Sequence, residues 1–384
     1  MKYQLRDYQQ RASDAAIKAI QDRRNGIIIL PTGSGKSLLI ADIASRITEP
    51  LLILQPSKEI LEQNYEKYLS YGFDDAGLYS ASVGRKDINR VTFATIGSII
   101  NKIDDFKHYK HVLIDECHLV QPRGGMYKTF LEDTKRTVLG LTATPYRLHN
   151  GMMGSMLKFL TRTRPRIFDE VLFYVQVKEL LASQHLAHLD YYDLTCINLG
   201  NVKTNSTGSD YDDASLYAEY HRSNYLQRLI STIRRLLTPK SGVPRKGILV
   251  FTRRVMEAQM VAEQIEHSAV VSADTPKKER EQILTNFRTG NIQVVINART
   301  LTTGFDYPEL DTVVMARPTK SLSLWYQCVG RAIRPAPNKT GWIIDLCGNI
   351  KRFGKVEDLT LECEGKNKWI ITSNGKQLTN VYFE

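Results

Sequence analysis

The sequence has no apolar run that approaches the ~20 residues of a membrane span, so a transmembrane helix is not expected. Its first residues, Met-Lys-Tyr-Gln-Leu-Arg-Asp, lack the apolar segment of a secretory signal. Cysteine is scarce: the five cysteines include no Cys-x-x-Cys pair, and no histidine pair completes a zinc-binding set. These absences argue against membrane, disulfide-rich and zinc-dependent classes, and they predict a cytoplasmic protein.

The charge of the chain is unbalanced because basic residues outnumber acidic ones. Lysine and arginine number 52 against 41 aspartate and glutamate residues, which gives a formal net charge of +11. Such an excess favours an anionic polymer as partner, although a merely basic soluble protein would have the same composition. At 384 residues and 42% hydrophobic content, the chain is expected to form two globular domains.

The most informative stretch is Leu-Pro-Thr-Gly-Ser-Gly-Lys-Ser at 30–37. The apolar run at 26–30 predicts a buried strand and the segment 38–44 predicts a helix. A strand–loop–helix setting is what a phosphate-binding loop requires. Leu30 stands where the general Gly-x-x-x-x-Gly-Lys-Ser/Thr pattern has its first glycine, which is a departure from that pattern.

The loop residues suggest how a triphosphate is held. Gly33 and Gly35 allow the backbone N–H groups to turn inward at a helix N-terminus. Lys36 can reach the β- and γ-phosphates, and the Ser37 hydroxyl can ligate Mg²⁺. ATP and Mg²⁺ are therefore the expected cofactors, with the following loop residues in contact: Thr32, Gly33, Ser34, Gly35, Lys36 and Ser37.

Short apolar strand candidates alternate with helical stretches in two successive series. They lie at 27–30, 51–54, 91–94, 112–115 and 138–142, and again at 248–251, 269–272, 294–297, 312–316 and 342–346. Near-continuous apolar strands in a βα series predict two parallel sheets covered by helices, an α/β fold.

The pattern also suggests where the parts of the chain meet. We expect a first domain at 1–146, a connector at 147–171, a second domain at 172–346 and a short C-terminal extension at 347–384. Within the second domain, 200–213 has the composition of a polar loop, and a single long helix is expected from about 214 to 237.

Two adjacent carboxylates follow the buried strand His-Val-Leu-Ile at 111–114. Asp115 suits Mg²⁺, directly or through water, and Glu116 suits the polarisation of a water that attacks a γ-phosphate. Strand ends are where open α/β sheets bind ligands. Asp-Glu alone is ordinary loop chemistry, but its place downstream of the phosphate loop favours a catalytic role.

A third group comes from the far half of the chain. Gln327, Arg331 and Arg334 have the spacing i, i+4 and i+7, which predicts one face of a helix that ends at Pro335. Two guanidinium groups on one face are costly to bury without anions, and phosphate is the obvious candidate. A solvated surface with spare arginines is the alternative.

Further motifs accompany these groups along the chain. The motifs are Leu-Arg-Asp-Tyr-Gln-Gln at 5–10, Gln-Pro-Ser-Lys at 55–58, Ala-Thr-Ile-Gly at 94–97, Asp-Glu-Cys-His at 115–118, Gly-Leu-Thr-Ala-Thr-Pro-Tyr-Arg at 140–147, Val-Phe-Thr-Arg-Arg at 250–254, Thr-Thr-Gly-Phe-Asp at 302–306 and Gln-Cys-Val-Gly-Arg-Ala-Ile-Arg at 327–334. Together, and in this order, they resemble a superfamily 2 helicase with a D-E-C-H box. The resemblance implies two tandem RecA-like domains that close over ATP.

The resemblance assigns roles residue by residue. Arg6 and Gln9 would contact the adenine side, while Gly304, Asp306 and Gln327 would complete the nucleotide cleft. Arg331 and Arg334 would be catalytic together with Lys36, Asp115 and Glu116. Coupling of hydrolysis to domain movement would involve His118, Thr142 and Thr144. A lone histidine at such a position is otherwise an ordinary structural residue.

Contacts to the nucleic-acid backbone are expected from short donors and cations at strand ends. These residues are Ser57, Lys58, Thr95, Thr252, Arg253 and Thr303. Each could equally be a helix cap or a turn residue. The sequence has no short motif that separates RNA from DNA.

Within the superfamily, the motifs are most similar to RadD-type bacterial or phage repair helicases, although the cysteine-bearing C-terminal region of that family is absent. The resemblance implies an ATP-driven motor on nucleic acid, DNA rather than RNA, in repair or recombination. A duplex- or junction-directed translocase and a motor subunit of a restriction-type complex remain open. A monomer that meets repair or replication proteins is expected.

Overall fold

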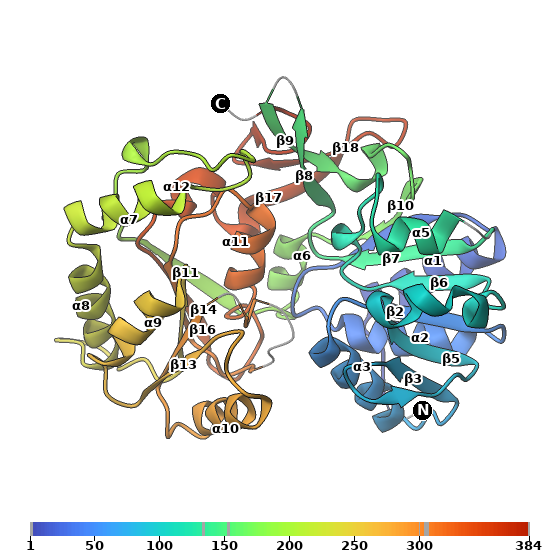
Figure 1. Ribbon diagram of the computed structural model, residues 1–384, viewed down its shortest axis with the longest axis horizontal. Coiled ribbons are helices and arrows are strands. Elements are labelled where there is room, and N and C mark those ends of the chain that lie inside the picture. The colour runs from blue at the N-terminus through green and yellow to red at the C-terminus, as the bar shows by residue number, and fades with distance from the viewer. Residues whose placement is uncertain (1–2, 133–134, 152–153, 299, 303–306, 383–384) are drawn as a thin grey trace.

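The computed structural model describes residues 3–132, 135–151, 154–298, 300–302 and 307–382. Two α/β domains lie side by side, the first on the right of Figure 1 and the second on the left. Each is built on a sheet whose central strands are buried apolar runs. This is the two-domain α/β fold that the sequence predicts.

The first sheet has eight strands in the order β10-β1-β7-β6-β2-β5-β3-β4. All neighbouring pairs are parallel except β3 and β4. The strands are β1 Gly26–Ile29, β2 Leu51–Gln55, β3 Ala76–Ser80, β4 Arg85–Lys86, β5 Val91–Thr95, β6 His111–Ile114, β7 Thr137–Thr142 and β10 Glu170–Tyr174. The five strands predicted for this half are confirmed, and their carboxyl ends carry the predicted loops.

Helices cover the first sheet, and α1 to α4 begin at or within predicted motifs. They are α1 Asp7–Gln21, α2 Lys36–Arg46, α3 Lys58–Ser70, α4 Ile96–Ile99 and α5 Met126–Glu132. The strand–loop–helix setting predicted around the phosphate loop is confirmed, because β1 ends at Ile29 and α2 begins at Lys36. Leu30, the departure from the general pattern, is fully buried in the core.

The second sheet has six parallel strands in the order β11-β16-β15-β12-β14-β13. They are β11 His188–Asp193, β12 Ile248–Thr252, β13 Ser268–Val271, β14 Val294–Ala298, β15 Thr312–Ala316 and β16 Thr340–Asp345. The helices of this half are α6 Val177–Ala182, α7 Asp213–Arg222, α8 Tyr225–Leu237, α9 Val255–Ala262, α10 Lys277–Arg288, α11 Leu322–Val329 and α12 Asn349–Phe353. The five strands predicted here are likewise confirmed.

The long helix predicted at 214–237 is wrong, because the chain breaks it into α7 and α8. Asn224 lies between them with φ +51°, a left-handed conformation that asparagine tolerates better than most residues. The rings of Tyr220 and Tyr225 stack across the break with centroids 4.1 Å apart. Apolar periodicity continues through the break, so periodicity alone could not reveal it.

The predicted boundary at residue 172 needs correction. The connector 147–171 contains most of a hairpin, β8 Tyr146–Gly151 with β9 Gly154–Phe159, and it leads into β10. β10 pairs in parallel with β1, so residue 172 lies inside a strand of the first sheet. The second sheet begins only at β11.

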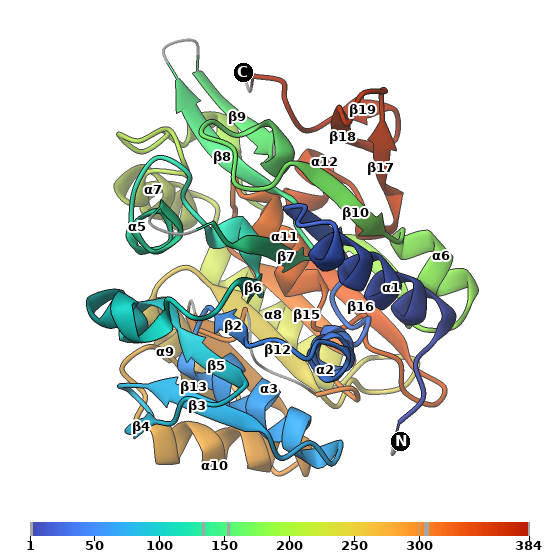
Figure 2. The same cartoon turned by 90° about the vertical axis from the view of Figure 1, so that its right-hand side faces the viewer.

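The C-terminal extension forms a small antiparallel sheet of β17 Leu359–Cys363, β18 Trp369–Ser373 and β19 Lys376–Gln377. It returns to the first domain, beside β10 and the hairpin (Figure 2). The Trp369 ring packs edge-on against Tyr174 at 5.0 Å, and the Gln176 amide donates to the Leu361 carbonyl at 2.8 Å. The chain thus crosses between the two domains twice.

No helix within the described part of the chain is long and apolar enough to cross a bilayer.

Candidate functional site

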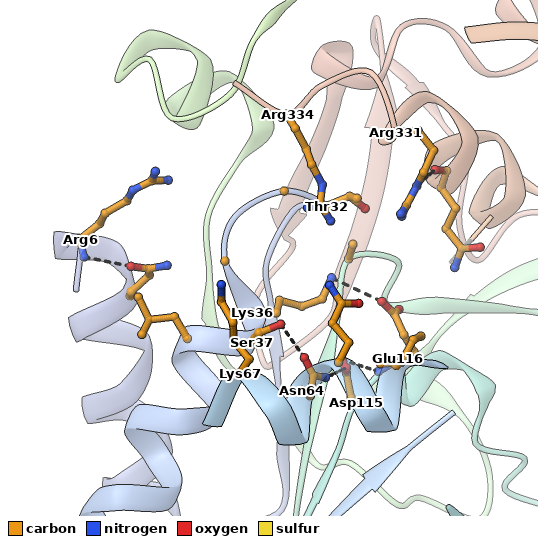
Figure 3. Close-up of a pocket in the computed structure, with 18 of the residues that line it drawn as sticks. Arg6, Thr32, Lys36, Ser37, Asn64, Lys67, Asp115, Glu116, Arg331 and Arg334 are labelled. Atoms are coloured by element: carbon orange, nitrogen blue, oxygen red, sulfur yellow. Dashed lines mark hydrogen bonds and ion pairs between the residues drawn. The ribbon is translucent and has the colours of Figure 1, made fainter. Parts of the chain in front are cut away.

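A cavity of about 440 Å³ lies where the two domains meet (Figure 3). Arg331 and Arg334 enter it from the second domain, and Asp115 and Glu116 lie on the opposite side, below the loop. Most residues predicted to bind nucleotide or to act in catalysis line it: Arg6, Gln9, Thr32, Gly33, Gly35, Lys36, Ser37, Asp115, Glu116, Gln327, Arg331 and Arg334. The fold therefore gathers into one place residues that lie more than 300 positions apart in the sequence.

The loop 30–35 can take its shape only with glycine at two positions. Gly33 and Gly35 have φ of +84° and +82°, which side chains other than glycine rarely adopt. A Cβ atom on Gly35 would also lie 2.5 Å from the Gln9 amide nitrogen. The N-terminus of α2 follows directly, so backbone N–H groups are available for an anion.

The start of α1 holds this loop. The Gln9 amide donates to the Ser34 carbonyl at 2.9 Å, and its oxygen accepts from the Arg6 backbone N–H at 3.0 Å. The Tyr8 hydroxyl, which sequence reasoning did not single out, donates to the same carbonyl at 2.6 Å. Ser34 therefore contributes its carbonyl to the support of the loop and is not among the cavity-lining residues.

A chain of hydrogen bonds joins the loop to the first carboxylate. The Ser37 hydroxyl donates to Asn64 at 2.6 Å, and the Asn64 amide donates to Asp115 at 3.3 Å. Ser37 and Asp115 supply the hard oxygen ligands that Mg²⁺ prefers. Asn64 was missed by the sequence analysis. Its spacing with Lys67 and Tyr71, at i, i+3 and i+7, is the signal that would have placed them on one face toward the site.

The second carboxylate is held between two basic groups. Glu116 has φ +47°, and its carboxylate lies 3.4 Å from the Lys36 ammonium and 3.3 Å from His118 Nδ1. Burial acts to raise the Glu116 pKa, but the attraction of Lys36 and the hydrogen bond from His118 outweigh it and lower the pKa. Burial and the Glu116 charge raise the Asp115 pKa.

His118 connects three parts of the site. Besides Glu116, its Nδ1 lies 3.0 Å from the Thr142 hydroxyl, and its Nε2 lies 3.4 Å from the Gln327 amide of the second domain. The Thr144 backbone N–H donates to the Thr142 hydroxyl at 3.0 Å. This geometry fits the coupling role predicted for His118, Thr142 and Thr144, which remains a prediction.

The arginine-bearing segment departs from the predicted single helix. α11 ends at Val329, and the chain continues in tight turns in which Arg331 N–H donates to the Cys328 carbonyl at 3.1 Å. The turn brings Gly330 against the phosphate loop, where an added Cβ would lie 2.8 Å from Thr32 Cβ. Arg331 and Arg334 still reach the cavity, but from a turn rather than from one helix face.

Both arginines are held in a low-polarity setting. Burial lowers the pKa of Arg331, and it lowers that of Arg334 to about 10. An anion stabilises a buried cation, so these two arginines suit an anionic ligand in the cavity. Lys339, which sequence reasoning missed, donates to the Arg334 carbonyl at 2.8 Å and fixes the turn.

Of the residues predicted to contact a nucleic-acid backbone, those that the structure describes do not line this cavity. Ser57 is the N-cap of α3 and accepts from the Ile60 N–H at 3.4 Å. The Thr95 hydroxyl lies 2.8 Å from that of Ser98, and the Lys58 ammonium donates to the Ser82 carbonyl. These contacts give each residue a structural role, and a nucleic-acid contact remains a prediction.

Arg253 requires a correction. It is buried, and its guanidinium donates to the Asp210 carboxylate at 2.9 Å, to the Tyr211 carbonyl at 2.7 Å and to Asp213. These bonds hold the polar loop and the start of α7 onto β12, so the side chain does not face solvent. Thr252 beside it is 1% exposed and donates to the Arg254 carbonyl at 3.2 Å.

Three predicted residues, Thr303, Gly304 and Asp306, lie outside the described part of the chain.

Replacement of Arg253 by alanine is expected to destabilise the protein by about 1.5–3 kcal/mol, the range for hydrogen bonds to a charged group. The physical reason is that Asp210 and Asp213 lose their common partner. Denaturant unfolding measures the change, with the exposed Arg235→Ala as control. Unchanged stability together with abolished nucleic-acid binding would instead support the original prediction that Arg253 contacts the nucleic-acid backbone.

The fold and the site together define a class: two tandem RecA-like domains with a phosphate loop at their junction. Residues 2–147 match the family described as "Type III restriction enzyme, res subunit", and residues 225–336 match "Helicase conserved C-terminal domain". Each match falls in one of the two domains. Both support the resemblance to superfamily 2 helicases.

Individual proteins are similar to this chain over most of its length. A "51.5 kDa protein" of Lactococcus phage (isolate 7-9) is 28% identical over 84% of this chain, which spans 66% of that protein. "DNA 3'-5' translocase XPB2" of Sulfurisphaera tokodaii is 26% identical over 87% of this chain and 79% of that protein. The structure of the "ATP-dependent Type ISP restriction-modification enzyme LlaBIII bound to DNA" is similar in fold, with a TM-score of 0.68, 19% identity, and coverage of 90% of this chain and 28% of that one.

Proposed function

We propose that the protein is an ATP-dependent DNA helicase or translocase that hydrolyses ATP between its two domains. One observation carries this proposal: the phosphate loop of the first domain and Arg331 and Arg334 of the second line the same cavity. Neither domain holds the whole set. Movement of one domain against the other would therefore change the chemistry at the γ-phosphate.

The first domain would bind the triphosphate and orient the attacking water. Lys36 pairs with Glu116 at 3.4 Å, and entering phosphates would compete for the Lys36 ammonium. Glu116 would then be released to polarise a water molecule. His118, at 3.3 Å from the same carboxylate, would keep Glu116 in place during this exchange.

Ser37 and Asp115 would hold Mg²⁺, because their oxygens lie on either side of Asn64 at the phosphate loop. When bound, the ion would neutralise charge on the β- and γ-phosphate oxygens. Asn64 would position both ligands through its two hydrogen bonds.

The second domain would complete the site. Arg331 and Arg334 would stabilise negative charge that develops on the transferred phosphoryl group. The contact between Gln327 and His118 would couple changes at the nucleotide site to the position of the second domain. Repeated closure and release would then shift a bound strand.

DNA is proposed as the substrate because the relative from Sulfurisphaera tokodaii is named a DNA translocase and the structural neighbour is described as bound to DNA. The net charge of +11 suits a polyanion. A motor subunit of a restriction-type complex is the second candidate, favoured by the match of residues 2–147. A RadD-type role in repair or recombination, with a monomer as the working unit, is part of the same proposal.

The test is the steady-state rate of ATP hydrolysis with single-stranded, duplex, forked and four-way DNA and with matched RNA. We expect DNA to stimulate the rate of ATP hydrolysis, because such a motor hydrolyses ATP productively only when it is bound to nucleic acid. RNA is expected to stimulate the rate less. A helicase should respond most to single strands or forks and a translocase to duplex or junctions. The Lys36→Ala variant measures the background rate of ATP hydrolysis. A rate indifferent to every nucleic acid would contradict the proposal.

A further inference from the structure

A surface of the first domain that shares no lining residue with the nucleotide cavity is strongly basic. We call it the basic surface and define it by Arg123, Arg147, Lys158, Arg162, Arg164 and Arg166. These residues come from the segment after the D-E-C-H box, from the β8–β9 hairpin and from the segment that follows it. The hairpin projects at the top of the molecule beside the C-terminal sheet (Figure 1).

The basic surface is hollowed. Two concavities of about 160 and 420 Å³ share Lys158 and Arg164 as lining residues. The larger one is also lined by Lys366 and Lys368 of the C-terminal extension. The C-terminal extension therefore adds positive charge to the basic surface.

Within the described part of the chain, few acidic groups balance this positive charge. Among the ion pairs formed by the described residues, none involves any of these eight cations, and Asp169 is the one acidic residue that lines either concavity there. Burial lowers the Lys158 pKa, and the charges of Arg123, Arg164 and Arg162 lower it further. The cations thus repel one another, and a polyanion would relieve that repulsion.

The basic surface is also linked to the hydrolysis machinery. β8 follows within four residues of Thr142, whose hydroxyl lies 3.0 Å from His118. Arg147 on β8 donates to the Val120 carbonyl, just after the D-E-C-H box. A ligand on the basic surface would therefore contact β8, which follows closely after Thr142 in the chain. The nucleotide cavity shares no lining residue with either concavity.

We propose that the basic surface binds the phosphodiester backbone of nucleic acid in addition to the strand-end loops. Closely spaced arginines that share a concavity suit successive phosphates, and such contacts position a nucleic acid without reading its sequence. This proposal rests on the proposed function, because it presumes that nucleic acid is the track of the motor.

The test is a triple variant, Arg162→Gln, Arg164→Gln and Arg166→Gln, in the full chain. We expect its Kd for fluorescein-labelled duplex or single-stranded DNA to rise about tenfold or more. The slope of log K against log[salt] should become shallower by roughly 0.7 to 0.9 for each phosphate that the variant no longer binds. ATP hydrolysis without DNA should be unchanged, and stimulation should need more DNA but reach the wild-type maximum.

The matched control removes three positive charges elsewhere: Arg235→Gln, Lys240→Gln and Lys246→Gln, in α8 and the loop before β12. Equal weakening by both triples would mean that only net charge matters and would overturn the proposal. Unchanged DNA binding by the first triple would overturn it too and would point to an acidic protein partner. If the wild-type protein binds no DNA, both the proposed function and this inference fail. If the wild-type protein binds DNA and the first triple variant binds it equally well, only this inference fails. Unchanged thermal melting of each variant excludes misfolding.

Discussion

Replacement of Arg334 by alanine is expected to lower ATP turnover by about 10³-fold or more while ATP affinity stays within a few-fold. Arg334 belongs to the domain without a phosphate loop, yet its side chain lies next to that loop: a Cβ on Gly33 would be 3.4 Å from Arg334 Cγ. We expect Lys36 and the loop backbone to hold ATP in the ground state. The arginine would act mainly on charge that develops during phosphoryl transfer.

The measurement separates kcat from KM in steady state, with nucleotide binding followed independently. Arg334→Lys should rescue little, because an ammonium cannot reproduce the planar fork of a guanidinium. The exposed Arg235→Ala should leave both constants unchanged. If Arg334→Ala instead weakens DNA binding and leaves ATP hydrolysis normal, the turn after α11 contacts the nucleic acid rather than the nucleotide. Our proposal that this arginine completes the ATP site across the two domains would then be wrong.

The central strands could be predicted from sequence because they are buried on both faces and read as continuous apolar runs. Two edge strands that were missed, β11 and β10, have other patterns. β11, His188–Asp193, lies at the edge of its sheet, and most of its residues are at least partly exposed. β10 is likewise an edge strand with half-buried residues. A strand paired on one side only does not need a fully apolar sequence, so composition does not reveal it.

The site was predictable where a short motif fixes both residue type and spacing, as at Gly33, Gly35 and Lys36. It was not predictable where a residue acts through tertiary contacts. Asn64 joins Ser37 to Asp115 only because α3 packs beside the loop. Arg253 stands in a predicted nucleic-acid motif, but the acidic loop at 210–213 folds onto it. Such partners are set by the fold and have no local signature.

Replacement of Glu116 by glutamine should yield a protein that binds ATP and DNA but hydrolyses ATP about 10²–10⁴ times more slowly. The amide has nearly the same shape as the carboxylate, so its place beside His118 should be retained. It cannot polarise the attacking water, however, and it carries no charge for Lys36. Lys36 would then be available to the phosphates from the start, which should leave affinity equal or higher.

Single-turnover hydrolysis by rapid quench, together with binding of a labelled ATP analogue, measures the two effects separately. Asp115→Asn is the informative comparison, because it removes the neighbouring carboxylate. We expect that variant to need more Mg²⁺ for half-maximal rate, whereas the Glu116→Gln rate should not recover at any Mg²⁺ concentration. Unaltered kcat in Glu116→Gln would move the role of general base away from Glu116. It would also make the Lys36–Glu116 pair at 3.4 Å a purely structural contact.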